Sequence, residues 1–423
     1  MDKAVTPAPA GVLARAAAAH LLEPPPLLLQ GMEAIRRHMD MDVAFISEFK
    51  GGRRVFRYLD SRLEAPPIQV GGSAPLEESY CQRVVDGRLP TLIPNACQNA
   101  EALTLGATLA LPVGAHLSVP IRLNDGRVFG TFCCFRSQPS AELNQRDMAT
   151  MRIFADVMAQ YFELELEQRE HAECLARQVE LALQPQQMRP VYQPIFDLPG
   201  GRVIGFEALT RFDCEPSRGP DQWFALAAQI ERSVELELHA IRLALSALDA
   251  LPDSCYLAIN ASPRTVIDGR LTRMLEAYPL RRIVLEVTEH EEVEQYSEIA
   301  HVVRPLHMAG LRVAVDDAGA GYASFKHILN LAPDIIKLDN SITRGIDADT
   351  SRQALAAALT RFAETTGGLL VAEGVENSAE LAALQRIGIR YGQGYALGRP
   401  APLQGALEQA RRVFGLPDQQ LTH

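Results

Sequence analysis

The chain has 423 residues, of which 47% are hydrophobic and 22% are charged. This length exceeds one ordinary domain, so we expect two or three globular domains. The 41 Lys and Arg residues against 52 Asp and Glu residues give a formal net charge of −11. Because binding to DNA or RNA needs clustered basic side chains, this charge argues against a nucleic-acid partner.

The seven cysteines are scattered along the chain and form no CxxC pair. Their distribution argues against a disulfide framework or a zinc site, and indicates reduced thiols in a cytoplasmic protein. Residues 1–26 include several prolines and charged residues, so we expect an extension rather than a signal peptide. No run of apolar residues reaches the length that a membrane span needs.

Residues 27–163 show the pattern of an α+β domain. Apolar and polar residues alternate over 41–49, which predicts a strand, and a Gly-Gly pair follows it. Two β-rich runs within 116–135 flank Asp125-Gly126, a strong signal for a hairpin turn. Apolar residues at helical spacing over 148–162 predict a helix.

This pattern, and above all the hairpin sequence SVPIRLNDGRVFGTFCCF, resembles a GAF domain, which is a small-molecule sensor fold. The resemblance implies that the domain regulates the rest of the chain by binding an unidentified ligand. A cyclic nucleotide, another small molecule or dimerisation alone all remain open. Cys133 and Cys134 are expected to be one core and one surface residue of a strand, and His116 a structural residue.

Residues 164–187 form a connector that is rich in helix formers and has no Gly or Pro before Pro185. Its apolar residues recur every three or four positions, as a short stripe. One interpretation is a solvated linker helix with one packed face. The other is a signalling helix that pairs across a dimer. The stripe comprises Ala172, Leu175, Val179 and Ala182.

Residues 188–415 alternate strand-like runs with helical stretches, and 416–423 form a tail. Eight strands in such an order over some 225 residues predict a (βα)8 TIM-like barrel. The predicted strands are 191–198, 203–212, 256–262, 282–289, 312–317, 335–339, 369–375 and 391–397.

Polar residues follow nearly every predicted strand of the barrel. The carboxyl ends of barrel strands meet at one mouth, where catalytic groups lie. Glu, Asp and Asn without His or Cys select hard cations such as Mg²⁺ or Mn²⁺. Two such ions can bind a phosphodiester, generate hydroxide and stabilise the leaving oxygen. The residues are Glu207, Asn260, Glu286, Glu289, Asp316, Asp317, Lys337, Asp339, Glu373, Glu376 and Gln393.

The same residues lie in a series of motifs that resembles the EAL family of phosphodiesterases. The resemblance covers the whole predicted barrel and implies hydrolysis of cyclic di-GMP to linear pGpG. In chain order the motifs are EALTR (207–211) after QPI (193–195), INASP (259–263), LEVTE (285–289), VDDAGAGYAS (315–324), IKLD (336–339), AEGVE (372–376) and GQGYALGRP (392–400).

The resemblance also implies a role for each residue. Two divalent cations, Mg²⁺ or Mn²⁺, would be bound, the first by Glu207, Asn260, Glu286 and Asp316 and the second by Asp316, Asp317 and Glu373. Lys337 would orient the attacking water, Gln393 would support bound water and substrate, and Glu289 would hold the loop after the fifth strand. The substrate would be bound by Gln193, Arg211, Asp339 and Glu376.

One loop departs from the family pattern DDFGTG, because Ala318 and Ala320 replace its Phe and Thr. Every implied metal-ligand position is nevertheless filled, so we expect an active enzyme. The alternatives are a receptor that binds cyclic di-GMP without turnover and a scaffold whose barrel only mediates contacts. A homodimer is expected, since two-fold dimers are the commonest oligomers.

Overall fold

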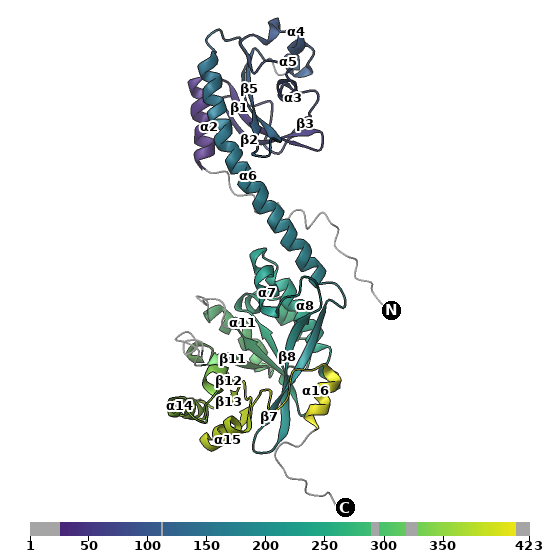
Figure 1. The fold of residues 1–423 in the computed structure, drawn as a ribbon, viewed down its shortest axis with the longest axis vertical. Coiled ribbons are helices and arrows are strands. Elements are labelled where there is room, and N and C mark those ends of the chain that lie inside the picture. The colour runs from purple at the N-terminus through teal and green to yellow at the C-terminus, as the bar shows by residue number, and fades with distance from the viewer. Residues whose placement is uncertain (1–25, 111–112, 289–295, 319–327, 412–423) are drawn as a thin grey trace, which may run out of the picture. The chain divides into compact units, whose positions relative to one another are not determined.

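The protein is described by a computed structural model that covers residues 26–110, 113–288, 296–318 and 328–411, without the side chains of residues 109, 110 and 317. The chain divides into two compact units, Met1–Cys174 and Leu175–His423 (Figure 1). None of the described helices is both long enough and apolar enough to cross a bilayer.

The first unit contains a six-stranded antiparallel sheet in the order β3-β2-β1-β6-β5-β4. As predicted, β5 and β6 form a hairpin around Asp125-Gly126. The strand and turn predicted at 41–52 are the first half of a second hairpin, in which β2 follows β1 after Gly51-Gly52. Gly51 and Gly126 adopt the left-handed conformation that such turns favour. The strands are β1 (Val43–Lys50), β2 (Arg53–Ser61), β3 (Ser73–Pro75), β4 (Leu92–Ile93), β5 (Ala115–Arg122) and β6 (Val128–Arg136).

Both faces of this sheet are covered. One face packs against α2 (Pro26–His38) and the first part of α6 (Gln145–Ala182), which lie side by side (Figure 1). The other face packs against the short helix α3 (Tyr80–Val85) and the following loops, which carry η1 (Ala96–Gln98), α4 (Ala100–Leu103) and α5 (Gly106–Ala110).

Cys133 and Cys134 therefore point to opposite faces of β6, yet both are fully buried. The expectation that one would lie at the surface was wrong. Alternation along a strand predicts which face a residue takes, but not whether helices cover that face.

The second unit is a closed barrel in the order β10-β11-β12-β13-β14-β7-β8-β9. Its core is built from the aliphatic side chains of the strands and of the surrounding helices. The strands are β7 (Met188–Asp197), β8 (Arg202–Phe212), β9 (Tyr256–Ala261), β10 (Ile283–Val287), β11 (Arg312–Ala318), β12 (Ile335–Leu338), β13 (Leu369–Ala372) and β14 (Tyr391–Gly392).

Most of the connections between these strands contain helices. They are α7 (Pro220–Gln229), α8 (Ser233–Leu245), η2 (Leu248–Ala250), α9 (Pro263–Ile267), α10 (Arg270–Leu275), η3 (Leu280–Arg282), α11 (Tyr296–Met308), α13 (Asn340–Thr343), α14 (Thr350–Thr366), α15 (Ser378–Ile387) and, after the last strand, α16 (Leu403–Ala410).

The first barrel strand runs opposite to the others. β7 pairs antiparallel with both β8 and β14, whereas β8 to β14 pair in parallel. Only residues 198–201 join β7 to β8, and Gly201 there has φ +59°. A turn this short can close a hairpin but cannot carry the crossover that parallel strands need.

The predicted stripe on the connector lies in the last part of α6. Leu175, Val179 and Ala182 are buried in the second unit, in a cluster around Trp223. This agrees with the interpretation of a helix with one packed face. Trp223 is the only tryptophan of the chain and is fully buried, so its fluorescence reports the folding of this unit.

Candidate functional site

The carboxyl ends of the parallel strands bring the predicted polar residues to one end of the barrel. Glu286 on β10 lies beside Asn260 on β9 in the strand register. Glu207 on β8 pairs with Gln193 on β7. The reversed direction of β7 thus places an amide side chain next to a carboxylate in the middle of a hairpin.

The Lys337 ammonium on β12 lies between four carboxylates. Its Nζ atom is 2.6 Å from Glu373 Oε1 and 2.7 Å from Glu286 Oε2. It is 3.4 Å from Asp316 Oδ1 and 3.5 Å from Glu207 Oε2. The Lys337 side chain is only 2% exposed, so this charge is stabilised by the carboxylates rather than by water.

Amide groups orient these carboxylates from the side of β7 and β14. Gln393 Nε2 donates hydrogen bonds to Gln193 Oε1 at 2.9 Å and to Glu207 Oε2 at 2.5 Å. Asn260 Nδ2 donates to Glu207 Oε1 at 3.1 Å, and Gln193 Nε2 donates to the Gly398 carbonyl at 3.0 Å. Gln393 Oε1 is buried and has no hydrogen-bond partner among the described residues.

The charges of this cluster are unbalanced. Burial raises the pKa of Glu286 to about 8, against the opposing effect of Lys337. Burial likewise raises the pKa of Glu373. Burial alone would lower the pKa of Lys337, but the surrounding carboxylates, Asp316 first, raise it above its usual value. With one ammonium among four carboxyl groups, the carboxylates repel each other and some take up protons, and bound divalent cations would replace those protons.

The donor set fits hard cations, because it consists of carboxylate and amide oxygens. Among the side chains that the structure describes, however, no three Asp, Glu, His or Cys groups converge in a metal-ligand arrangement. The carboxylates instead surround the Lys337 ammonium. Cation binding would therefore draw some of them away from Lys337.

We expect Glu286→Gln to flatten the pH dependence of stability in the presence of a chelator. A carboxyl group with a raised folded-state pKa binds a proton on folding. Its stabilising contribution is present below the unfolded value of 4.5 and is lost as the pH rises through about 8. Urea unfolding followed by Trp223 fluorescence measures the free energy of unfolding. Between pH 4.5 and about 8 this free energy should fall by a few kcal/mol in the wild type and by clearly less in the variant.

The exposed Glu276 on the surface of the barrel supplies a matched control. Glu276→Gln should leave the slope of stability against pH unchanged. Equal slopes for Glu286→Gln and the wild type would contradict the raised pKa of Glu286.

The structure places the remaining predicted residues around this cluster. Glu376 lies at the mouth, with Oε2 3.8 Å from Arg344 Nη2. The Asp339 carboxylate caps α13 by accepting a hydrogen bond from the Ser341 amide at 2.9 Å. Arg211 donates from Nη1 to the Thr210 carbonyl at 2.8 Å.

Two of the predicted residues lie partly or wholly outside the described part of the chain. Asp317 belongs to β11, but its side chain is not described, and Glu289 falls within 289–295. The altered loop is described only as far as Ala318, which is fully buried in the core of the barrel.

Two neighbouring pockets open at this end of the barrel. The first has a volume of about 320 Å³ and is lined by Glu207, Asp316, Lys337, Glu373 and Gln393, among others. The second has a volume of about 530 Å³ and is largely apolar, with Phe224 and Ile241 in its wall together with Arg211 and Asn260. Leu209 lines both pockets, so a polar and an apolar compartment adjoin each other.

The sequence did not single out three further residues of the polar pocket: Asn340, Arg344 and Tyr395. Tyr395 lies within the motif GQGYALGRP and could have been identified from it. Asn340 begins the short helix α13 after the IKLD motif and Arg344 follows its last residue, and no spacing rule marks either of them.

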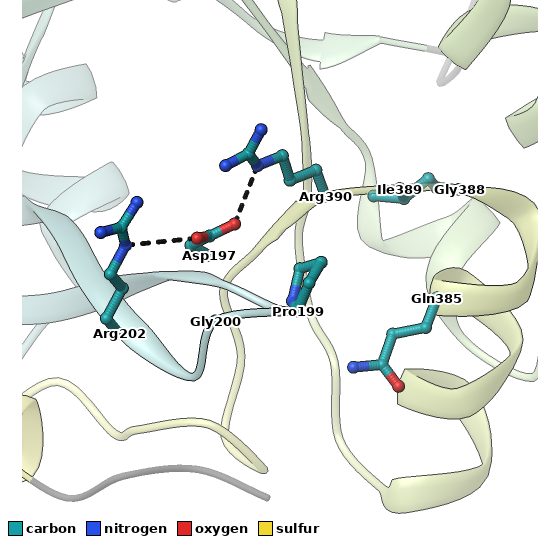
Figure 2. Close-up of a pocket in the computed structure, with 8 residues that line it drawn as sticks. All are labelled: Asp197, Pro199, Gly200, Arg202, Gln385, Gly388, Ile389 and Arg390. Atoms are coloured by element: carbon teal, nitrogen blue, oxygen red, sulfur yellow. Dashed lines mark hydrogen bonds and ion pairs between the residues drawn. The ribbon is translucent and has the colours of Figure 1, made fainter.

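A third hollow lies at the opposite end of the barrel, where β8 and β14 begin. Figure 2 shows the Asp197 carboxylate between Arg390 and Arg202, whose Nε atoms lie 2.9 and 3.3 Å from it. The remaining lining residues, Pro199, Gly200, Gln385, Gly388 and Ile389, carry no ionisable group. This end lacks the carboxylate cluster and is not the candidate site.

Comparison with known protein families identifies two domains in the chain. The family model of the EAL domain matches residues 176–400, and a family model of the GAF domain matches residues 24–163. The probable cyclic di-GMP phosphodiesterase PdeA of Escherichia coli is 31% identical over 193 residues, which are 44% of this chain and 26% of that protein. The cyclic di-GMP phosphodiesterase PA2567 of Pseudomonas aeruginosa is 32% identical over 222 residues, 50% of this chain and 38% of that protein.

The chain thus spans less than half the length of these two relatives. Among solved structures, the EAL enzyme Bd1971 in its cAMP-bound and cyclic di-GMP-bound form covers 88% of this chain, and 93% of that structure is matched. With a TM-score of 0.53 and 17% identity, it shows a likeness of fold. Because the EAL model matches just over half of the residues, the chain belongs to the EAL domain family, with a GAF domain ahead of the barrel.

Proposed function

We propose that this chain hydrolyses cyclic di-GMP to linear pGpG at the mouth of its barrel. The observation that carries the proposal is the buried cluster of Lys337 with four carboxylates, which opens into a polar pocket. The relatives named as cyclic di-GMP phosphodiesterases support the choice of substrate.

Two divalent cations, Mg²⁺ or Mn²⁺, fit the oxygen donors of this cluster. Glu207, Asn260, Glu286 and Asp316 would hold the first, and Asp316, Asp317 and Glu373 the second. When bound, such ions activate water and stabilise the charge that develops on a phosphodiester.

The side chains around the cations would position the reactants. The Lys337 ammonium lies among the carboxylates that would hold the cations. Its positive charge would therefore lie close to the attacking water and to the phosphate oxygens of the substrate. Gln393 fixes the Glu207 carboxylate through a short hydrogen bond, and its Oε1, which has no hydrogen-bond partner among the described residues, would accept a hydrogen bond from bound water. Gln193 holds the Gln393 amide in this orientation.

The two adjoining pockets match the two chemical parts of a cyclic dinucleotide. A phosphodiester would lie in the polar pocket beside Lys337, and a guanine base in the apolar pocket beside Phe224. Arg211 lines the apolar pocket and suits a guanine edge or a phosphate. Asp339 and Glu376 would contact the substrate at the rim.

The GAF domain would regulate this activity by binding a small molecule, in a cytoplasmic homodimer. The domain extents 27–163 and 188–415, joined by a helical linker, belong to the same proposal. In this arrangement the long helix α6 would carry the signal, because it contributes to the core of each unit.

The test is a product assay on the full chain. The protein is incubated with cyclic di-GMP and Mg²⁺, Mn²⁺, Ca²⁺ or a chelator, and the nucleotides are separated by chromatography. We expect pGpG with Mg²⁺ and Mn²⁺ only, because the larger and looser coordination shell of Ca²⁺ activates water poorly. Tight binding without turnover under every metal would instead identify a cyclic di-GMP receptor.

A further inference from the structure

Two cysteine thiols meet inside the GAF domain, away from the barrel site. Cys81 lies on α3 and Cys133 on β6, and their Sγ atoms are 3.5 Å apart. Both side chains are fully buried in the core between the sheet and α3. A disulfide has an S–S distance of about 2.05 Å, so the two sulfur atoms would need to approach by only about 1.5 Å.

A buried arginine stands beside this pair without a carboxylate. Arg54 is 8% exposed, and its Nη1 donates to Cys81 Sγ at 3.4 Å. In the described part of the chain it forms no ion pair, and its Nε is buried without a hydrogen-bond partner. Arg36 and Arg57 of the same unit, by contrast, pair with Asp or Glu. The Arg54 guanidinium also lies over the Phe56 ring, with Cζ 5.0 Å from the ring centroid, but a ring carries no net charge. Among the groups in contact with Arg54, the Cys81 thiol is the one that can become an anion.

Hydroxyl groups surround the second sulfur. Ser118 Oγ lies 3.1 Å and Thr131 Oγ1 3.2 Å from Cys133 Sγ, and Ser47 Oγ lies 3.8 Å from Cys81 Sγ. The hydrogen bond from Cys133, together with Arg54, lowers the pKa of Cys81, whereas burial raises the pKa of Cys133. The two shifts run in opposite directions, so Cys81 is the more acidic thiol of the pair, and the more acidic thiol is the one placed to act as the nucleophile.

We propose that Cys81 and Cys133 form a reversible dithiol–disulfide pair in the GAF domain, with Cys81 as the thiolate that Arg54 stabilises and a hydroperoxide as the oxidant. In the first step Cys81 S⁻ attacks hydrogen peroxide, the O–O bond breaks, and Cys81–SOH and hydroxide form. In the second step Cys133–SH attacks that sulfur and expels water. The two sulfurs lose two electrons, the peroxide gains two, and a dithiol reductant reverses the reaction.

The burial of the pair selects the size of the oxidant. Hydrogen peroxide is small and neutral, and can reach the pair through a brief local opening of the six-residue helix α3. Glutathione disulfide is bulky and charged, and would need a much larger opening. We therefore expect oxidation by hydrogen peroxide and not by glutathione disulfide over the same period.

The direct test maps disulfides in the wild-type chain. The protein is treated with hydrogen peroxide, free thiols are alkylated, and tryptic peptides are analysed by mass spectrometry. We expect a Cys81–Cys133 cross-link with the loss of two hydrogens, which dithiothreitol reverses. If the exposed Cys97 and Cys174 are oxidised while Cys81 and Cys133 remain alkylatable thiols, the proposal is overturned.

Three variants assign the roles. Cys133→Ser should leave a sulfenic acid on Cys81 that reacts with dimedone. Arg54→Gln should slow the oxidation by roughly tenfold for each pKa unit that the Cys81 thiol rises. Cys134→Ser is the matched control, because Cys134 is equally buried on the same strand but faces the other core. Wild-type rates for both Arg54→Gln and Cys134→Ser would contradict the role of Arg54, and thermal unfolding verifies that each variant is folded.

Discussion

Glu207→Gln is expected to lower kcat for cyclic di-GMP hydrolysis by about a thousandfold or more. The Glu207 carboxylate accepts hydrogen bonds from Gln393 and Asn260, and lies 3.5 Å from the Lys337 ammonium. A glutamine keeps the volume but loses the negative charge. The amide nitrogen of the glutamine is a hydrogen-bond donor, and it would face one of the donor groups of Gln393, Asn260 or Lys337. The glutamine would therefore neither bind a cation nor accept all the hydrogen bonds that the carboxylate accepts.

The measurement is the initial rate of pGpG formation in Mn²⁺, with cyclic di-GMP affinity determined separately by calorimetry. Glu276→Gln removes the same charge from an exposed position and should keep the wild-type rate. A Glu207→Gln enzyme with near wild-type kcat would exclude Glu207 from the catalytic centre. A Glu207→Gln enzyme that still binds cyclic di-GMP but does not hydrolyse it would show that Glu207 acts in the chemical step rather than in substrate binding.

Lys337→Met should abolish turnover and make the stability of the barrel depend on divalent cations. The substitution removes the buried positive charge among four carboxylates and leaves them to repel each other. Loss of one partner from a buried ionic network typically costs about 3–5 kcal/mol. Mg²⁺ or Mn²⁺ should restore much of this loss, because the ions replace the missing charge.

Urea unfolding followed by Trp223 fluorescence, with a chelator or with Mn²⁺, measures this effect in the second unit. Lys50→Met serves as the control, since Lys50 is exposed at the end of β1 in the other unit. The wild type and Lys50→Met should show the same response to Mn²⁺. If Lys337→Met in chelator is as stable as the wild type, the Lys337 ammonium is not the counter-charge of the cluster.

The order of the motifs was sufficient to predict the barrel and to predict that the polar residues after its strands meet at one end. Parallel strands have their carboxyl ends at one edge, so a polar residue after each strand implies a shared mouth. That argument placed Lys337 beside several carboxylates, and the structure brings four of them around its ammonium. They belong to Glu207, Glu286, Asp316 and Glu373.

The same argument could not give the direction of β7. Pattern reasoning treats each strand alike, whereas the short turn at Pro199 and Gly200 reverses the chain and pairs Gln193 with Glu207. Nor could it show that Asp339 caps a helix while Glu376 lines the mouth, because both simply follow a strand.

Periodicity and motif order were enough to predict the local features: where strands and turns occur, which residue types follow each strand, and which family they resemble. The charged partners of each buried side chain became visible only in the folded chain. The tertiary structure placed four carboxylates on Lys337, covered Cys134 with helices, and left Arg54 facing the thiol of Cys81 instead of a carboxylate. Burial and electrostatic partners arise from contacts between segments that are distant in the sequence, and periodicity along the chain does not record such contacts.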